Sequence, residues 1–90
     1  MQFIKMVQFT RLVKVAGQLR EFNFRKLKNG ESPLFSVNVC NERGDRILFH
    51  IAKKDNNWKV SAEETPPQWI LQAETNLGAV IDDELTSGNW

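Results

Sequence analysis

The chain has 90 residues, a formal net charge of +1 and 41% hydrophobic side chains, which is typical of one soluble globular domain with a single core. Cys40 is its only cysteine, so an intrachain disulfide and a zinc site built from several thiolates are both excluded. Polar residues interrupt the apolar N-terminal segment, a pattern typical of neither a signal peptide nor a membrane helix. We therefore expect a single cytoplasmic domain over residues 1–90 that does not associate with membranes.

Charged residues are strongly segregated along the chain. Residues 1–28 carry seven basic side chains against one acid, Glu21, and residues 63–90 carry six acids and no Lys or Arg. The local balances are therefore +6 and −6, which the total charge conceals. Such asymmetry indicates either a charged partner or pairing within the molecule, and it does not determine a fold.

Alternating apolar residues over 11–62 predict an antiparallel sheet. The alternation changes phase once near its start: Val13, Val15 and Leu19 share one phase, and Phe22 and Phe24 take the other. A strand whose side chains change face needs a bulge or a sharp bend. We therefore predict a long first strand that bends between Gly17 and Glu21. Residues 1–10 are predicted either as a short extra strand or as a tail.

The segment Glu42-Arg43-Gly44 fits a three-residue hairpin loop with Gly44 in the left-handed conformation. The predicted pairs are Val39 with Ile47, Val37 with Phe49 and Phe35 with Ile51. A register shifted by one residue would turn the apolar side chains of one strand to the wrong face. The three-residue loop is therefore the predicted connection.

Two further hairpins complete the predicted sheet. A turn centred on Asn29-Gly30 would set Phe24 opposite Phe35 and Phe22 opposite Val37. Pro33 lacks the N–H that a tight turn would require there, so we expect a wider loop with the same pairing. A loop at Asp55-Asn56 pairs Ile51 with Val60.

Apolar residues at three- and four-residue spacing predict a helix over residues 65–85. Thr65 is placed to cap its N-terminus, the two prolines that follow suit its first turn, and Gln68 completes a capping box. Gly78 would weaken the helix interior by about 1 kcal/mol relative to alanine. Residues 86–90 are predicted to be a tail. The expected fold is α+β, a four-stranded antiparallel meander with one C-terminal helix packed on one face (ββββα).

The residues that could support catalysis are too far apart in the predicted sheet. Cys40 lies opposite Arg46, and His50, the only histidine, lies opposite Ser36. Four residues of strand separate these two rows, about 13 Å at about 3.3 Å per residue. A Cys–His nucleophile pair is therefore not expected. The sequence also has no phosphate-binding glycine loop and no metal-ligand spacing, so we expect no enzyme activity, no cofactor and no metal.

Three consecutive acids, Asp82, Asp83 and Glu84, lie near the predicted end of the helix. Their side chains would point in different directions, whereas hard cations require converging oxygens. Acids at a helix C-terminus also oppose the helix dipole. Either the basic first strand lies beside them or they face a partner, so they form a candidate acidic contact patch.

The polar side of the predicted sheet, which the helix leaves uncovered and which we call the open face, is basic and rich in hydrogen-bonding groups. It should present Asn23, Arg25, Ser36, Asn38, Arg46, His50, Lys59 and Ser61. Four strands followed by a helix is similar in topology to the Pur-repeat and whirly families of single-stranded nucleic-acid binders, and this resemblance implies nucleic-acid binding through the open face. Single-strand binders stack bases on aromatic side chains, but the aromatic residues of this sheet are all predicted to face inward.

The favoured interpretation is a non-enzymatic binding or assembly module that associates with a protein partner or with itself. Exposed charge pairs contribute only about 0–1 kcal/mol each, so the separated charges would orient such an association more than drive it. Binding of single-stranded nucleic acid through the basic open face is the alternative. An aromatic residue on that face would favour the alternative.

Overall fold

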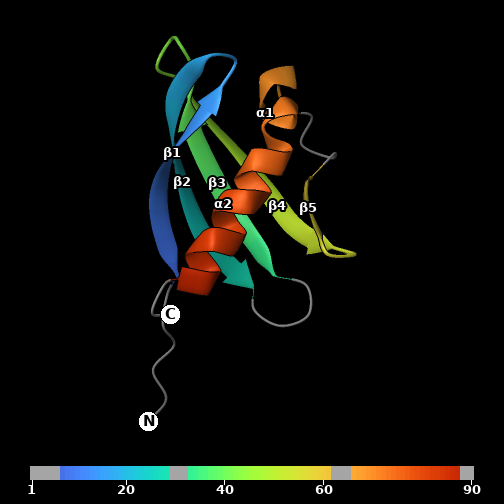
Figure 1. The fold of residues 1–90 in the computed structure, drawn as a ribbon. Helices are drawn as coiled ribbons and strands as arrows, with labels where there is room; N and C mark the ends of the chain where they lie inside the picture. Colours follow the sequence, from blue (N-terminus) through green and yellow to red (C-terminus); the bar gives the residue numbers. More distant parts are fainter. Residues whose placement is uncertain (1–6, 29–32, 62–65, 88–90) are drawn as a thin grey trace.

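The computed structural model describes residues 7–28, 33–61 and 66–87. They form an antiparallel sheet of five strands in the order β1-β2-β3-β4-β5, with two consecutive helices on one face (Figure 1). The fold is therefore α+β, as predicted, with five strands instead of four. The elements are β1 (Gln8–Val15), β2 (Gln18–Lys28), β3 (Leu34–Cys40), β4 (Arg46–Lys54), β5 (Asn57–Val60), α1 (Gln68–Gln72) and α2 (Glu74–Ser87).

A tight hairpin separates the first two strands where the sequence predicted a bend. β1 and β2 pair in one continuous register in which Val15 faces Gln18, so the turn consists of Ala16 and Gly17 alone. Both turn residues have positive φ, 51° and 80°, as a type I′ turn requires. A two-residue hairpin pairs odd-numbered with even-numbered residues, which by itself produces the change of phase. Residues 8–10 belong to β1.

The register between β2 and β3 differs from the prediction by two residues. The observed pairs are Phe22 with Val39, Phe24 with Val37 and Lys26 with Phe35. The predicted pairing of Phe24 with Phe35 is therefore wrong, and the ladder has an irregularity just before Lys28. An even-numbered shift leaves every side chain on its predicted face, so the inward position of these phenylalanines is retained. The centre of this connection lies outside the described residues.

The β3–β4 hairpin confirms the predicted register. The pairs are Val39 with Ile47, Val37 with Phe49 and Phe35 with Ile51. The backbone N–H of Asn41 donates to the carbonyl of Asp45 at 2.9 Å, which closes the three-residue loop, and Gly44 has a φ of 85°. The Asn41 side-chain oxygen accepts from the N–H groups of Arg43 and Asp45, both at 2.9 Å.

The β4–β5 hairpin is also as predicted. Ile51 faces Val60, and the two turn residues, Asp55 and Asn56, have φ values of 52° and 67°. Both values suit the type I′ turn that matches the twist of the flanking strands. The last strand, β5, has four residues and lies at the edge of the sheet opposite β1 (Figure 1).

The predicted helix is two helices that meet at Ala73. The N-cap of α1 is Pro67, which provides no side-chain cap, so Gln68 is the first helical residue and not the third, as the predicted capping box requires. Thr65, the predicted cap, lies outside the described residues. The N–H of Ala73 donates to Ile70 at 3.0 Å, and the carbonyl of Ala73 accepts from Leu77 at 2.8 Å. α2 extends to Ser87, beyond the predicted end.

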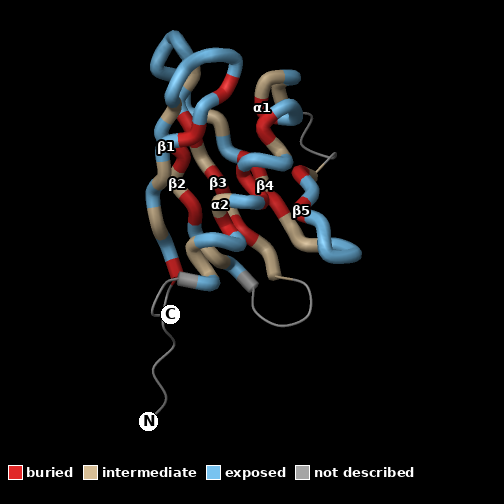
Figure 2. Tube along the Cα trace, viewed as in Figure 1, coloured by how far each residue is buried: buried red, intermediate tan, exposed pale blue. Residues whose placement is uncertain are grey.

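The core lies between the sheet and the helices, where α2 crosses the sheet (Figures 1 and 2). Along β3 the buried residues alternate with partly buried ones, as expected for a sheet covered on one face. Phe49 and Leu77 were both predicted at the sheet–helix contact, and both are fully buried. The other large side chains that are almost completely buried are Phe22, Phe24, Phe35, Ile51, Ile70 and Ile81.

Gly78 is required by the close packing of α2 against Trp58 of β5. A Cβ atom at position 78 would lie 2.8 Å from the Trp58 Cβ and 2.9 Å from its Cδ1. Neither atom is the free end of a flexible side chain, so added volume must displace either the strand or the helix. The cost of glycine in the helix interior therefore allows a close approach between α2 and β5.

We predict that Gly78→Ala lowers the free energy of unfolding, on the order of 1 kcal/mol, because overpacking costs about 1–3 kcal/mol and better helix propensity recovers about 1 kcal/mol. Urea denaturation measures the change. Thr75→Ala is the control, since Thr75 is exposed on the same helix and its replacement should be neutral or stabilising. A Gly78→Ala protein more stable than the parent would contradict the observed packing.

Phe49→Ala and Leu77→Ala should each destabilise the domain by about 2–5 kcal/mol, because each leaves a cavity in the centre of the core. Stabilities of small domains are of the order of 5–15 kcal/mol, so either change should lower the melting temperature substantially. Thermal unfolding followed by circular dichroism tests this. A melting temperature within a few degrees of the parent would show that the residue is not in the core.

Candidate interaction surface

The register places the predicted polar residues together on the open face, opposite the helices. Asn23 faces Asn38, Arg25 faces Ser36, and Ser36 faces His50, which forms two neighbouring rows across the sheet. The other predicted residues also face outward. Arg46 lies on β4, Lys59 lies on β5, and Ser61 directly follows β5. The binding role of these residues stays a prediction, but their common location follows from the pairing.

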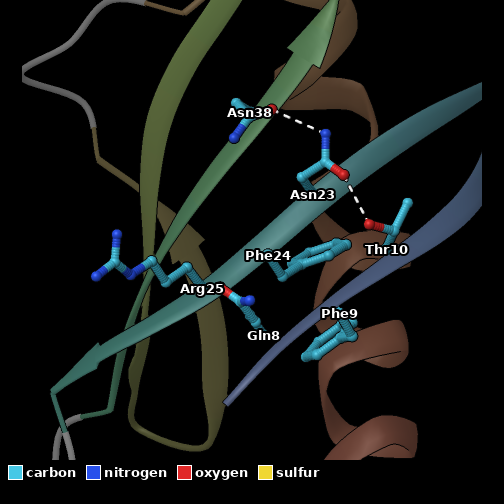
Figure 3. A pocket seen from close by; sticks show the side chains of 7 residues that line it. All are labelled: Gln8, Phe9, Thr10, Asn23, Phe24, Arg25 and Asn38. Atoms are coloured by element: carbon cyan, nitrogen blue, oxygen red, sulfur yellow. Dashed lines mark hydrogen bonds between the residues drawn. The ribbon is translucent and has the colours of Figure 1, made fainter. Parts of the chain in front are cut away.

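A chain of hydrogen bonds crosses four strands on the open face. Thr10 Oγ1 donates to Asn23 Oδ1 at 2.7 Å, and Asn23 Nδ2 donates to Asn38 Oδ1 at 2.9 Å (Figure 3). Arg46 Nη1 donates to the same Asn38 oxygen at 2.7 Å. Arg25 extends away from this row (Figure 3). These bonds fix the amide groups in one orientation, because each group is held by a neighbouring strand.

A shallow hollow of about 370 Å³ adjoins this row, at the lower end of the range for small-ligand sites. The residues that line it are Gln8, Phe9, Thr10, Asn23, Phe24, Arg25 and Asn38 (Figure 3). They include no carboxylate, histidine or cysteine, so no general base of these types lies beside the Thr10 hydroxyl.

The open face also carries exposed leucines that the sequence analysis missed. Leu12, Leu19 and Leu48 are 62%, 66% and 57% exposed. Leu19 was predicted to face inward with Val13 and Val15, but the hairpin turns it to the open face. The signal was in the sequence, since a two-residue turn explains the phase change as well as a bend does. The open face is consequently aliphatic as well as basic.

The candidate acidic contact patch is paired within the molecule. Arg11 of β1 contacts Asp83 at 3.3 Å and Glu84 at 2.9 Å, and Lys53 of β4 lies 3.6 Å from Asp82. The hydrogen bond to Glu84, followed by the contacts with Asp83, raises the pKa of the Arg11 guanidinium above its ordinary value. Of the two explanations for acids at this helix end, the structure therefore shows the first, a basic strand beside them.

Two acids of α2 also hold the last strand. Trp58 Nε1 donates to Asp82 Oδ1 at 2.9 Å, and the backbone N–H of Val60 donates to Glu74 Oε2 at 2.8 Å. Lys59 lies 3.8 Å from the other Glu74 oxygen. A charged acceptor roughly doubles the strength of such hydrogen bonds, so these acids have a structural role.

Cys40 and His50 occupy the positions predicted for them. Cys40 faces Arg46 and His50 faces Ser36, so four residues of strand separate the two rows and no nucleophile–base contact is formed. Among the described residues, no group of three or more His, Cys, Asp or Glu side chains is arranged to hold a metal ion. No described helix is both long enough and apolar enough to cross a membrane.

Comparison of the chain with known protein families, with curated proteins and with solved structures found no match. The surfaces described above are therefore the basis for considering function.

Asp82→Ala should destabilise the protein more than Asp83→Ala does. Asp82 accepts the Trp58 hydrogen bond, whose loss should cost about 1–2 kcal/mol, whereas Asp83 makes an exposed ion pair worth about 0–1 kcal/mol. The two substitutions remove the same charge from the same helical turn, so each controls for the other. Equal unfolding free energies in urea would show that the Trp58 contact contributes nothing.

Proposed function

We propose that the protein is a non-enzymatic association module that assembles with further copies of itself through the uncovered side of its sheet. The observation that supports this is the location of Leu12, Leu19 and Leu48, three leucines more than half exposed on β1, β2 and β4. Leu12 and Leu19 are diagonal neighbours, and Leu48 lies two strands further across the same face. Exposed apolar side chains on one face favour burial against another protein, at about 25 cal/mol per Å² of apolar surface.

The helix side is a poorer candidate for the contact. Its acids are already engaged by Arg11, Lys53 and Trp58, so a partner would have to break these interactions to use them. The described acids of α2 are thus engaged within the fold, by Arg11 of the basic N-terminal region and by Lys53 and Lys59 of the middle of the chain. What remains exposed on the open face is aliphatic surface bordered by basic and amide groups.

Binding of single-stranded nucleic acid is the second candidate, because the open face has an excess of basic residues. Arg25, Arg46 and Lys59 lie on it, and Glu21 is the acid that the pairing places there. Phosphate groups would be attracted to this face. However, no described aromatic residue faces outward from the sheet, so bases would lack the stacking surface that such binders use.

Sedimentation velocity over a wide range of protein concentration tests the proposal. We expect a reversible, concentration-dependent increase in sedimentation coefficient, which replacing Leu12, Leu19 and Leu48 together by serine abolishes. Leu71→Ser is the matched control, because Leu71 is an exposed leucine on α1 and its replacement should leave association unchanged. A protein that stays monomeric at every concentration contradicts the proposal.

Titration of a labelled single-stranded oligonucleotide tests the second candidate in the same buffer. We expect no saturable binding at physiological salt. Binding whose affinity falls steeply with salt, as counterion release requires, and that is lost on charge reversal at Arg25 and Lys59, would favour nucleic acid instead.

A further inference from the structure

The two edges of the sheet differ, and only β1 offers a long uninterrupted strand. β1 is an eight-residue strand with no register shift against β2, and it contains no proline. Its odd-numbered residues bond to β2, as the turn-closing pair of Val15 with Gln18 and the bond from Lys26 N–H to the Val7 carbonyl show. The backbone groups of Gln8, Thr10, Leu12 and Lys14 must therefore point away from the sheet.

The opposite edge is short and partly closed. β5 has four residues, and one of its outward-directed backbone groups, the Val60 N–H, donates to the Glu74 carboxylate at 2.8 Å. Natural sheets protect their edges in such ways, since unpaired backbone groups are a template for another strand. Among the described residues, β1 has neither of the two features seen at β5, and Lys14 is the one lysine on its edge.

We propose that the assembly is a two-fold dimer in which β1 of one copy pairs antiparallel with β1 of the other, with Leu12 on the axis. This inference rests on the proposed self-association and places its contact at the β1 edge of the open face, so that Leu12 lies in the pairing itself and Leu48, on β4, lies outside it. Residues 9–15 of both copies would pair and join the two sheets into one. The interface would be isologous, so it closes at two copies.

Side-chain complementarity selects Leu12 as the centre. In this register Leu12 faces the partner's Leu12, Thr10 faces the partner's Lys14, and Arg11 faces the partner's Val13. No like charges meet, and apolar residues face one another at the axis. A register centred on Arg11 would oppose two arginines. A register centred on Thr10 would set Leu12 against the partner's Gln8.

The leucines of β1 and β2 support the same centre. Leu12 faces Glu21, and Lys14 faces Leu19, so the two leucines are diagonal neighbours on the open face. The Leu12-centred pairing places the two Leu12 side chains against each other on the axis, and Leu19 of each copy flanks its own Leu12 from the second strand. Leu12, 62% exposed in the single chain, would thereby lose part of its contact with water, whereas Leu19 on the second strand would keep its outer side exposed.

Charge does not oppose this pairing. The formal net charge of the chain is +1, so two copies repel each other weakly. The Arg11 guanidinium contacts Asp83 and Glu84 of its own chain, on the helix side of the sheet. Lys14 meets a threonine instead of another cation.

Cysteine cross-linking at Thr10, Leu12 and Lys14 tests both the edge and the register. All three side chains are exposed, and each is replaced singly in a Cys40→Ser background, because Cys40 is itself exposed. In the proposed dimer the two Leu12 Cα atoms lie about 5.5 Å apart, within the range of a disulfide. The two Lys14 positions are offset by four residues, about 13 Å. Leu12→Cys should therefore form a covalent dimer under mild oxidation, and Lys14→Cys should not.

A second variant tests the backbone pairing without relying on oxidation. The Leu12 N–H points away from β2, so Leu12→Pro removes a donor that the single chain does not use. We expect this variant to keep the parent's circular dichroism spectrum and to sediment as a monomer. Persistence of the dimer in a folded Leu12→Pro protein would overturn the β1 pairing.

The outcomes separate this inference from the proposed function. A parent protein that never associates contradicts both. A parent that dimerises while Leu12→Cys fails to cross-link, or cross-links no faster than Lys14→Cys, retains the association and overturns the β1 geometry. Preferential cross-linking at Thr10 would overturn the Leu12-centred register.

Discussion

The packing of Trp58 against α2 fixes the position of the helix on the sheet. The indole approaches the helix backbone at Gly78, donates to Asp82 one turn further on and packs edge-on against Phe35, with ring centres 5.6 Å apart. Lys53 lies 5.8 Å from the centre of the same ring. One side chain of the last strand thus sets both the distance of the helix from β5 and its rotation.

That position brings the two charged ends of the chain together. α2 crosses from β5, where Gly78 meets Trp58, toward β1, where Arg11 meets Asp83 and Glu84 (Figure 1). The acids oppose the helix dipole, and the basic side chains beside them compensate for that cost. Since exposed ion pairs stabilise proteins only slightly, the hydrophobic contact sets the geometry and the charges adjust to it.

Most of the sheet could be predicted from the sequence because turn chemistry and alternation agree there. Gly44 and the Asp55–Asn56 pair take the positive φ values that their hairpins require, so both registers were correct. The first hairpin was missed because alanine at position 16 is an unusual residue for positive φ, and its partner Gly17 was interpreted as a bend. The β2–β3 register failed because an irregularity next to Lys28 shifts the pairing in a way that alternation does not reveal.

The candidate surface was predictable only in part, because the face of each side chain depends on the strand registers and turns that were predicted. The polar residues of the open face depended on registers that were correct or were shifted by an even number, so their face was predicted correctly. The leucines depended on the first hairpin, which reverses the face of Leu19, and their exposure follows only from the observed turn.

The missed hairpin has a structural consequence beyond the number of strands. A single bent strand would have left β2 residues at the edge of the sheet, with Leu19 in the core. The turn at Ala16 and Gly17 instead adds β1 as a new edge strand and places Leu12 and Leu19 beside each other on the open face. The covered face keeps Val13 and Val15 in the core, and the open face gains aliphatic surface that the single chain does not bury. The hairpin that completes the core is thus also the source of the apolar surface next to the unprotected edge.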